Sequence, residues 1–218
     1  MKLLLAGEAV ELLAEKALWW PAERTLFIAD LHLGKAASFR ALGQPVPSGT
    51  TQDNLDRLSA LIDHHGAARI VFLGDFLHAA AAQQASVLNP VRHWRARHCG
   101  VALVLVRGNH DSHAGDPPAD LQIAVVDEPW PLGPFAACHH PQKLEGRLVL
   151  AGHLHPTVTL NGPARDRQRL PAFWRSEGLL VLPAFGAFTG GSSQRVPAGA
   201  DCFAVGGGRV WQLPVSFI

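Results

Sequence analysis

Residues able to hold metal ions recur along the chain in short motifs. The motifs combine carboxylates, an amide and imidazoles, and in chain order they are Asp30-x-His32, Gly74-Asp75, Gly108-Asn109-His110-Asp111, His139 and Gly152-His153-x-His155. Hard carboxylate oxygen, an amide carbonyl and neutral imidazole together suit Mn²⁺, Fe or Zn²⁺. No cysteine is placed among them, which argues against a thiolate site. The series therefore predicts a metal site.

Apolar runs typical of buried strands precede the first three motifs, at residues 25–29, 69–73 and 101–106. Leucine and isoleucine recur at helical spacing over residues 55–62, and a second helix is predicted from about Ala82 to His98. Strands that alternate with helices indicate βα units around a buried sheet. The ends of such strands can converge on one point, which would bring the motifs together.

Side chains alternate along a strand, so Asp30 and His32 would point to the same side and one metal could take both. The same reasoning applies to His153 and His155. Taken singly, Gly74-Asp75 is also typical of a turn, and a lone histidine is also typical of a core or surface position. The joint occurrence of all the motifs in one order favours a site.

The second half of the chain is predicted to be mostly β. Its strand candidates are short apolar runs separated by proline and glycine, at residues 123–126, 135–138, 148–151, 158–160 and 179–182. A final hairpin is predicted from 202–205 and 210–213, with glycines 206–208 as its turn. At 218 residues and 48% hydrophobic content, the chain can bury a substantial core, and we expect one domain over residues 1–218.

The composition of the chain limits its expected location and partners. The formal charge of +1 says little about a nucleic-acid partner. The 3 cysteines resemble neither a disulfide framework nor a zinc motif, which favours a reducing, cytoplasmic location. The apolar run at the N-terminus is shorter than a signal-peptide core, and no stretch approaches the roughly 20 apolar residues of a membrane span. We therefore expect no association with membranes.

The motifs resemble those of the calcineurin-like metallophosphoesterases, whose blocks are DxH, GD, GNHD, H and GHxH. The resemblance implies a four-layer αββα sandwich, an α/β fold in which two mixed β-sheets are flanked by helices. It also implies two divalent metal ions, with Mn²⁺ favoured over Fe or Zn²⁺. By this resemblance Asp30, His32 and His155 hold one ion. Asn109, His139 and His153 hold the other, and Asp75 bridges the two.

Two assignments remain open at this point. His139 or His140 could be the ligand, and we choose His139 because related enzymes resemble a His-x-Pro pattern, here His139-His140-Pro141. The second concerns the position three places after the bridging aspartate, where the family more commonly has another residue and this chain has His78. His78 could reach the first metal ion or only contact its ligands.

The resemblance implies hydrolysis by in-line attack on phosphorus, with a metal-bridging hydroxide as the nucleophile. His110 is not a ligand in the family pattern, so we expect it to be catalytic, stabilising the transition state or protonating the leaving oxygen. Asp111 would orient its ring. Asn109 and His110 are also expected to contact the substrate phosphate.

Segments outside the shared motifs resemble one bacterial branch of the family, the endonucleases or phosphodiesterases associated with a DNA ligase and helicase in the DNA damage response. These segments are 29–40, 43–49 with Pro45 and Pro47, 138–141 and 182–191. The likeness implies cleavage of DNA, single-stranded or damaged, with that ligase and helicase as partners.

Basic residues give the substrate assignment some independent support. Lys35 and Arg40 follow the first ligand pair closely enough to meet substrate phosphate. Four arginines follow the last ligand pair in one polar segment, and they could track a nucleic-acid backbone or lie in a solvated loop: Arg165, Arg167, Arg169 and Arg175.

Two other functions fit the same motifs. A phosphatase or phosphodiesterase for a small nucleotide would share every ligand and differ only in its pocket. An interaction module that keeps the fold without catalysis is less favoured, because the ligands and His110 are all retained.

Overall fold

The computed structural model describes residues 1–46, 49–162, 166–191 and 194–214. Its strands form two mixed sheets, which confirms the α/β fold expected from the sequence. The first sheet contains β1 (Lys2–Leu5), β2 (Glu8–Leu12), β3 (Ala17–Trp20), β4 (Thr25–Ile28), β5 (Arg69–Leu73), β6 (Ala102–Val106) and β7 (Ile123–Val126), in that spatial order. The second contains β8 (Trp130–Leu132), β9 (Phe135–Ala137), β10 (Leu148–Ala151), β11 (Thr157–Asn161), β12 (Arg167–Ser176), β13 (Leu179–Val181), β14 (Asp201–Gly206) and β15 (Arg209–Leu213).

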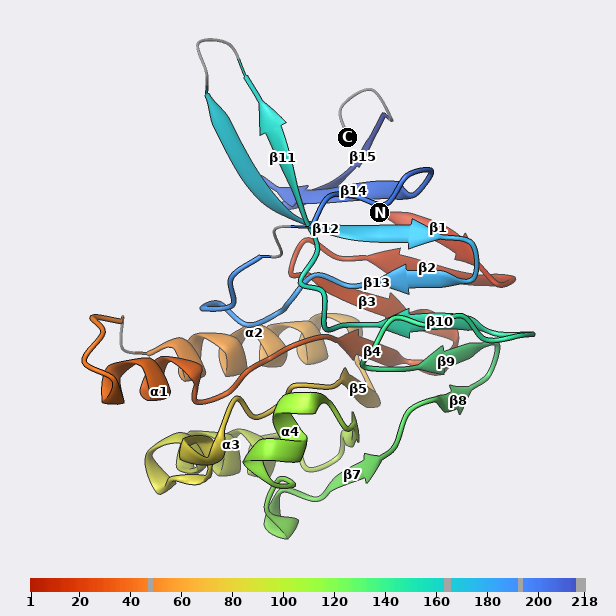
Figure 1. The fold of residues 1–218 in the computed structure, drawn as a ribbon. Coiled ribbons are helices and arrows are strands. Elements are labelled where there is room, and N and C mark those ends of the chain that lie inside the picture. Colours follow the sequence, from red (N-terminus) through yellow and green to blue (C-terminus); the bar gives the residue numbers. More distant parts are fainter. Residues whose placement is uncertain (47–48, 163–165, 192–193, 215–218) are drawn as a thin grey trace.

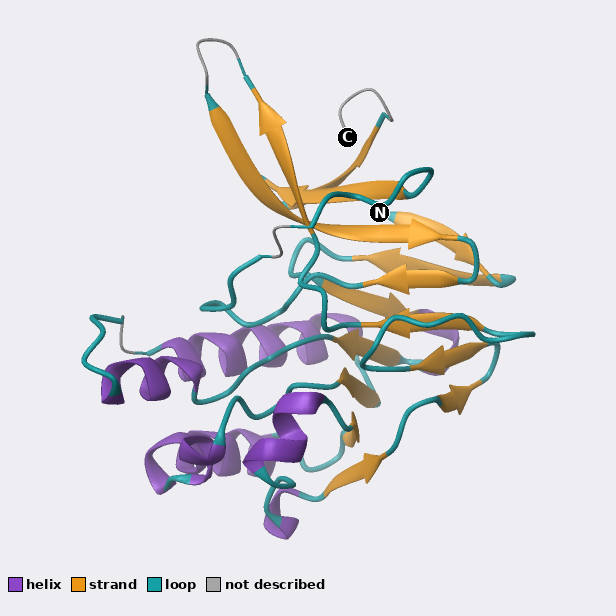
Figure 2. Ribbon diagram, viewed as in Figure 1, coloured by secondary structure: helices purple, strands orange, loops and turns teal. Residues whose placement is uncertain are grey.

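The described helices lie against the first sheet, on the side away from the second (Figure 1; Figure 2). They are α1 (Lys35–Ala41), α2 (Thr50–His65), α3 (Ala85–Arg97) and α4 (Asn109–Ala114), with short 3₁₀ turns at Pro21–Glu23, Ala80–Gln83 and Ala119–Leu121. Leu55, Leu58 and Leu61 form the buried face of α2 and pack with the first sheet. The leucine spacing thus predicted both this helix and its buried face. None of the described helices is long and apolar enough to span a membrane.

An apolar core fills the space between the two sheets. Phe27 of the first sheet and Phe135 and Phe173 of the second belong to one hydrophobic cluster, and all three are fully buried. Trp20 packs edge-on against Phe135 with their ring centroids 5.0 Å apart. These contacts hold the sheets face to face and so fix the loops of one sheet relative to those of the other.

Parallel pairing brings the motifs to one edge of the molecule. β4, β5 and β6 pair in parallel, so the loops after them carry Asp30, Asp75 and Asn109 to the same end of the first sheet. In the second sheet β9 and β10 are also parallel, and they are followed by His139 and His153. The candidate ligands therefore come from both sheets, as the convergence of strand ends predicted.

The polar segment after His155 is a strand rather than a solvated loop. Residues Arg167–Ser176 form β12, which pairs with β11, β13 and β14. Its polar sequence gives no strand signal, and the strand is stabilised by backbone hydrogen bonds to antiparallel partners on both sides. Strands β1 to β3 were also not predicted, because the first 20 residues lack clear alternation. Arg165 and Pro47 lie outside the described residues.

Candidate metal centre

The candidate ligands lie on loops with unusual backbone geometry. Left-handed φ angles occur at Asp30 (52°), His32 (48°), Asp75 (51°), His153 (69°) and His155 (46°). Such angles are uncommon for residues other than glycine and cost of order 1 kcal/mol each, so they persist where surrounding structure imposes them. The expectation that strand alternation aligns each ligand pair was wrong, because both pairs lie beyond the strand ends.

A first cluster joins Asp30, His32 and His155, whose ligand atoms lie within 4.8 Å of one another. His32 Nε2 is 3.2 Å from His155 Nε2, which is 3.7 Å from Asp30 Oδ1. Nδ1 of His155 lies 3.1 Å from the Gly190 carbonyl oxygen and donates to it, so Nε2 is the ring nitrogen that faces the cluster. Burial lowers the pKa of His32, favouring the neutral ring that a metal requires.

A second cluster joins Asn109, His139 and His153. His139 Nε2 is 2.8 Å from Asn109 Oδ1 and 3.0 Å from His153 Nδ1. Nδ1 of His139 lies 3.0 Å from the Leu73 carbonyl oxygen, an acceptor that fixes the proton on Nδ1 and leaves Nε2 facing Asn109 and His153. Burial lowers the pKa of His139 as well as that of His153.

Asp75 lies between the two clusters. Its Oδ2 is 3.7 Å from His32 Nε2, and its Oδ1 is 3.4 Å from His139 Nε2. Burial raises the pKa of this carboxyl, with the nearby Asp30 acting in the same direction. Two cations would relieve that repulsion, so the arrangement matches a bridging carboxylate.

Both clusters fit divalent cations in spacing and in chemistry. Ligand atoms bound at about 2.1 Å to one ion lie roughly 3 to 4 Å apart, which is the separation seen in each cluster. The donor set of carboxylate, amide oxygen and imidazole suits Mn²⁺, Fe or Zn²⁺ and does not choose among them. The described residues thus provide two adjacent candidate sites that share one aspartate.

Two motif glycines are required by close approach of the ligands. A methyl group on Gly74 would lie 2.1 Å from His139 Nδ1, and one on Gly108 would lie 2.4 Å from Asp75 Oδ1. Neither neighbour can move without displacing a ligand. The glycines in the GD and GNHD motifs are therefore part of the site's packing.

The geometry favours His139 over His140 as the ligand. His139 is fully buried at the centre of the second cluster, whereas the His140 side chain is 47% exposed and its Nδ1 lies 2.6 Å from Glu128 Oε1. Glu128 Oε2 also accepts the main-chain N–H groups of His139 (2.6 Å) and His140 (2.8 Å). Glu128 was not predicted from the sequence, because a single acidic residue before a proline carries no signal.

His78 and His110 border the first cluster. His78 Nδ1 is 3.4 Å from His32 Nδ1, the ring nitrogen opposite the one that faces His155, so His78 contacts a ligand from behind. The His110 ring stacks on His78 with centroids 4.7 Å apart and donates from Nδ1 to the His78 carbonyl oxygen at 2.7 Å. Because this bond occupies Nδ1, Nε2 is the ring nitrogen of His110 that can act on a substrate.

Asp111 does not orient His110 as expected. Its two oxygens accept the backbone N–H groups of Leu77 (2.9 Å) and Gly108 (3.0 Å), so it joins the loop after β5 to the start of α4. Burial raises the pKa of Asp111 to about 6. Its contribution is to hold the backbone that carries Asn109 and His110.

The two basic residues near the first motif differ in position. Lys35 begins α1 and is half-buried, and the carboxylates that act on it are Asp75 and Asp30. Burial lowers its pKa despite those charges. Arg40 lies in the last turn of α1 and is exposed. Lys35 is therefore the one that the structure brings to the clusters.

Comparison with known proteins gives a consistent picture. A family model described as calcineurin-like phosphoesterase matches residues 23–131. The crystal structure of the Pseudomonas putida nuclease MPE is 46% identical, with a TM-score of 0.87 over 98% of this chain and 99% of that chain. YfcE, a phosphoesterase from E. coli, is 16% identical with a TM-score of 0.39 over 87% of this chain and 97% of that chain, a likeness too weak to bear on the site. No curated protein matches the chain.

Proposed function

This chain belongs to the calcineurin-like phosphoesterase family and is a metal-dependent phosphoesterase, and we propose that it cleaves phosphodiester bonds in DNA as an endonuclease. The observation that carries the proposal is the pair of ligand clusters that share Asp75 at the common edge of the two sheets. The nuclease from Pseudomonas putida, similar over nearly the whole of both chains, supports nucleic acid as the substrate class.

The proposed ligands divide between the two ions as the clusters do. Asp30, His32 and His155 would hold one divalent ion. Asn109, His139 and His153 would hold the other, with Asp75 between them. When bound, two such ions activate a water molecule at neutral pH and neutralise charge on the phosphoryl oxygens. Mn²⁺ is the ion we propose.

The protein's own residues would supply the remaining steps. The Leu73 and Gly190 carbonyls hold the His139 and His155 rings in their ligating tautomers. His110 would meet the substrate through Nε2, because its Nδ1–H donates to the His78 carbonyl. A ring protonated at both nitrogens would give the Nε2 proton to the leaving oxygen and keep the one on Nδ1. Lys35, which is near enough for the charges of Asp75 and Asp30 to act on it, would meet a phosphoryl oxygen.

The test compares a diester with a monoester. Metal-stripped protein is assayed with and without Mn²⁺ on bis-p-nitrophenyl phosphate and p-nitrophenyl phosphate, followed by circular single-stranded DNA. We expect faster diester turnover that requires metal, and cleavage of the circle, which has no ends. Activity confined to the monoester would instead identify a phosphatase, and a diesterase inactive on DNA would act on small nucleotides. Stoichiometric metal with no hydrolysis of any ester would leave only an interaction module.

The biological setting is a further proposal. A role in the DNA damage response, with a DNA ligase and a helicase as partners, rests on the sequence segments outside the metal motifs. Co-purification of the protein with a ligase or helicase from its own cells would support it. A preference for intact duplex over single-stranded or damaged DNA would count against it.

A further inference from the structure

The β11–β12 hairpin has two chemically different faces. β11 pairs with the first half of β12, with Thr159 opposite Arg169 and Asn161 opposite Arg167. Paired residues share a face, and residues two apart in a strand do so too. One face therefore carries threonine, asparagine and arginine, while the other carries Val158, Leu160 and Leu170. The hairpin extends beyond the two sheets (Figure 1).

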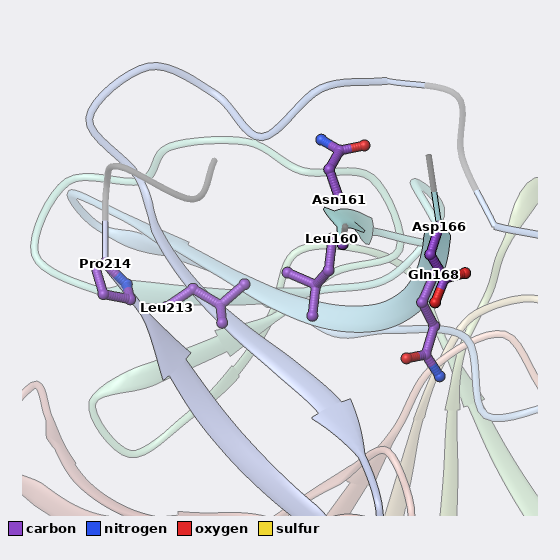
Figure 3. Close-up of a pocket in the computed structure, with 7 residues that line it drawn as sticks. Leu160, Asn161, Asp166, Gln168, Leu213 and Pro214 are labelled. Carbon is purple, nitrogen blue, oxygen red and sulfur yellow. The ribbon is translucent and has the colours of Figure 1, made fainter. Parts of the chain in front are cut away.

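The apolar face packs on the rest of the protein. Val158 is buried in a cluster with Trp174 and Cys202, and Leu160 and Leu170 pack against that cluster. Toward the tip, Leu160 and Gln168 face Leu213 and Pro214 across a pocket of about 440 Å³ (Figure 3). The apolar side thus faces the rest of the second sheet, and Arg167 and Arg169 on the opposite face are exposed.

The arginine face begins at the metal centre. Thr157 follows the candidate ligand His155 by two residues, and a methyl group on Gly191 would meet Thr157 Cγ2 at 2.1 Å. The same position on Gly191 is 3.4 Å from Arg169 Nη2. Its neighbour Gly190 provides the carbonyl that holds the His155 ring. Arg169 therefore lies beside the loop that positions a ligand, and Arg167 lies one rung farther out.

Side chains of β11 orient both arginines. Nε of Arg169 donates to Thr157 Oγ1 at 3.0 Å, and Nε of Arg167 donates to Asn161 Oδ1 at 3.2 Å. These bonds set the two guanidinium groups side by side along one face of the hairpin. The planar fork of a guanidinium suits phosphate.

We propose that Arg169 and Arg167 bind successive phosphates of a single-stranded DNA that runs from the metal centre along the β11–β12 hairpin. This inference rests on the proposed nuclease function. Alternate residues of a strand lie about 7 Å apart, which is of the order of the spacing between phosphates in an extended single strand. The rigid duplex would not follow one twisted hairpin in this way. The track ends before Asp166, whose charge opposes an anion at the tip.

The test separates substrate tracking from catalysis. In the double variant Arg167→Gln/Arg169→Gln, the side-chain amide can still donate to Asn161 and Thr157 while the charge is lost. Turnover of bis-p-nitrophenyl phosphate, whose one phosphate would be held at the metal centre, is expected to stay at the wild-type value. The slope of log(kcat/KM) against log[salt] for an oligothymidine should become shallower by about 0.7 for each lost phosphate contact. The control is Arg97→Gln/Arg209→Gln, which removes equal charge from exposed sites on α3 and β15.

Binding of a fluorescent oligothymidine to metal-stripped protein gives a second readout that does not depend on activity. Weaker binding by the hairpin variant than by the control supports the track, even if the enzyme proves inactive on DNA. Equal binding and equal salt slopes for the two variants would refute it. If the hairpin variant also lost diester turnover, the single variant Arg167→Gln, one rung farther from the ligand loop, decides the matter by the same two measurements.

Discussion

Glu128 is predicted to control affinity for the second metal ion without contacting it. Replacing it with alanine removes the acceptor for the main-chain N–H groups of His139 and His140. The His139 N–H is buried, and an unsatisfied buried donor costs about 1 to 3 kcal/mol. The chain can relieve that cost by moving His139, which would draw Nε2 away from Asn109 and His153. Loss of such an outer partner typically lowers metal affinity about 10- to 100-fold.

Two further variants sharpen this prediction. Glu128→Gln keeps one acceptor oxygen for the backbone and should lose less affinity than Glu128→Ala. His140→Ala removes only the ring contact at 2.6 Å and leaves both backbone bonds in place, so its metal affinity should stay near wild type. The assay is calorimetric titration of metal-stripped protein with Mn²⁺, together with metal content after gel filtration. Two equivalents of Mn²⁺ bound by Glu128→Ala with wild-type affinity, alongside a lower unfolding free energy, would show that Glu128 only stabilises the fold.

Further predictions concern the proposed ligands, the catalytic role proposed for His110, and one partly buried lysine. His139→Ala should lose one metal equivalent and nearly all turnover, and a greater loss in His140→Ala would reverse the assignment. His110→Ala should retain both metal equivalents while kcat falls by about 10² or more, as measured by steady-state kinetics on the diester. Gly74→Ala should release metal, because its methyl group would overlap the His139 ring; unchanged metal content would contradict that packing. Burial lowers the pKa of Lys16 to about 7, so the unfolded chain binds more protons between pH 7 and about 10, and this residue makes stability rise across that range. In Lys16→Met the rise in unfolding free energy, measured with urea, should be smaller.

The elements that position the site followed from sequence wherever apolar periodicity was strong. Runs at residues 69–73 and 148–151 correspond to β5 and β10, because a strand buried on both faces leaves a continuous apolar signature. The run at 123–126 corresponds to β7, a partly buried strand at the edge of the first sheet. β12 escaped prediction because its first residues are Arg-Gln-Arg, and pairing with neighbours distant in sequence decides its conformation.

The candidate site was predictable in its members but not in its geometry. The order of motifs identified the residues that come together, yet the backbone of Asp30 and His32 leaves the strand and turns left-handed. Local sequence does not encode that conformation, which the packing of several loops imposes. Contacts that involve backbone groups could not be predicted from the sequence either. The carbonyls of Leu73, Gly190 and His78 set ring tautomers, and any residue type could have supplied them.

The division of the proposed ligands between the two sheets has a consequence for how the protein assembles. A chain divided between β7 and β8 would leave Asp30, His32, Asp75 and Asn109 on the first piece, and His139, His153 and His155 on the second. Neither piece holds a complete set for either ion. Each ion would therefore act as a cross-link between the halves, adding its binding free energy to that of the phenylalanine-rich interface between the sheets. Removing the metal should therefore weaken the association of the two halves. A protein that loses its ions would lose both this stabilisation and its activity.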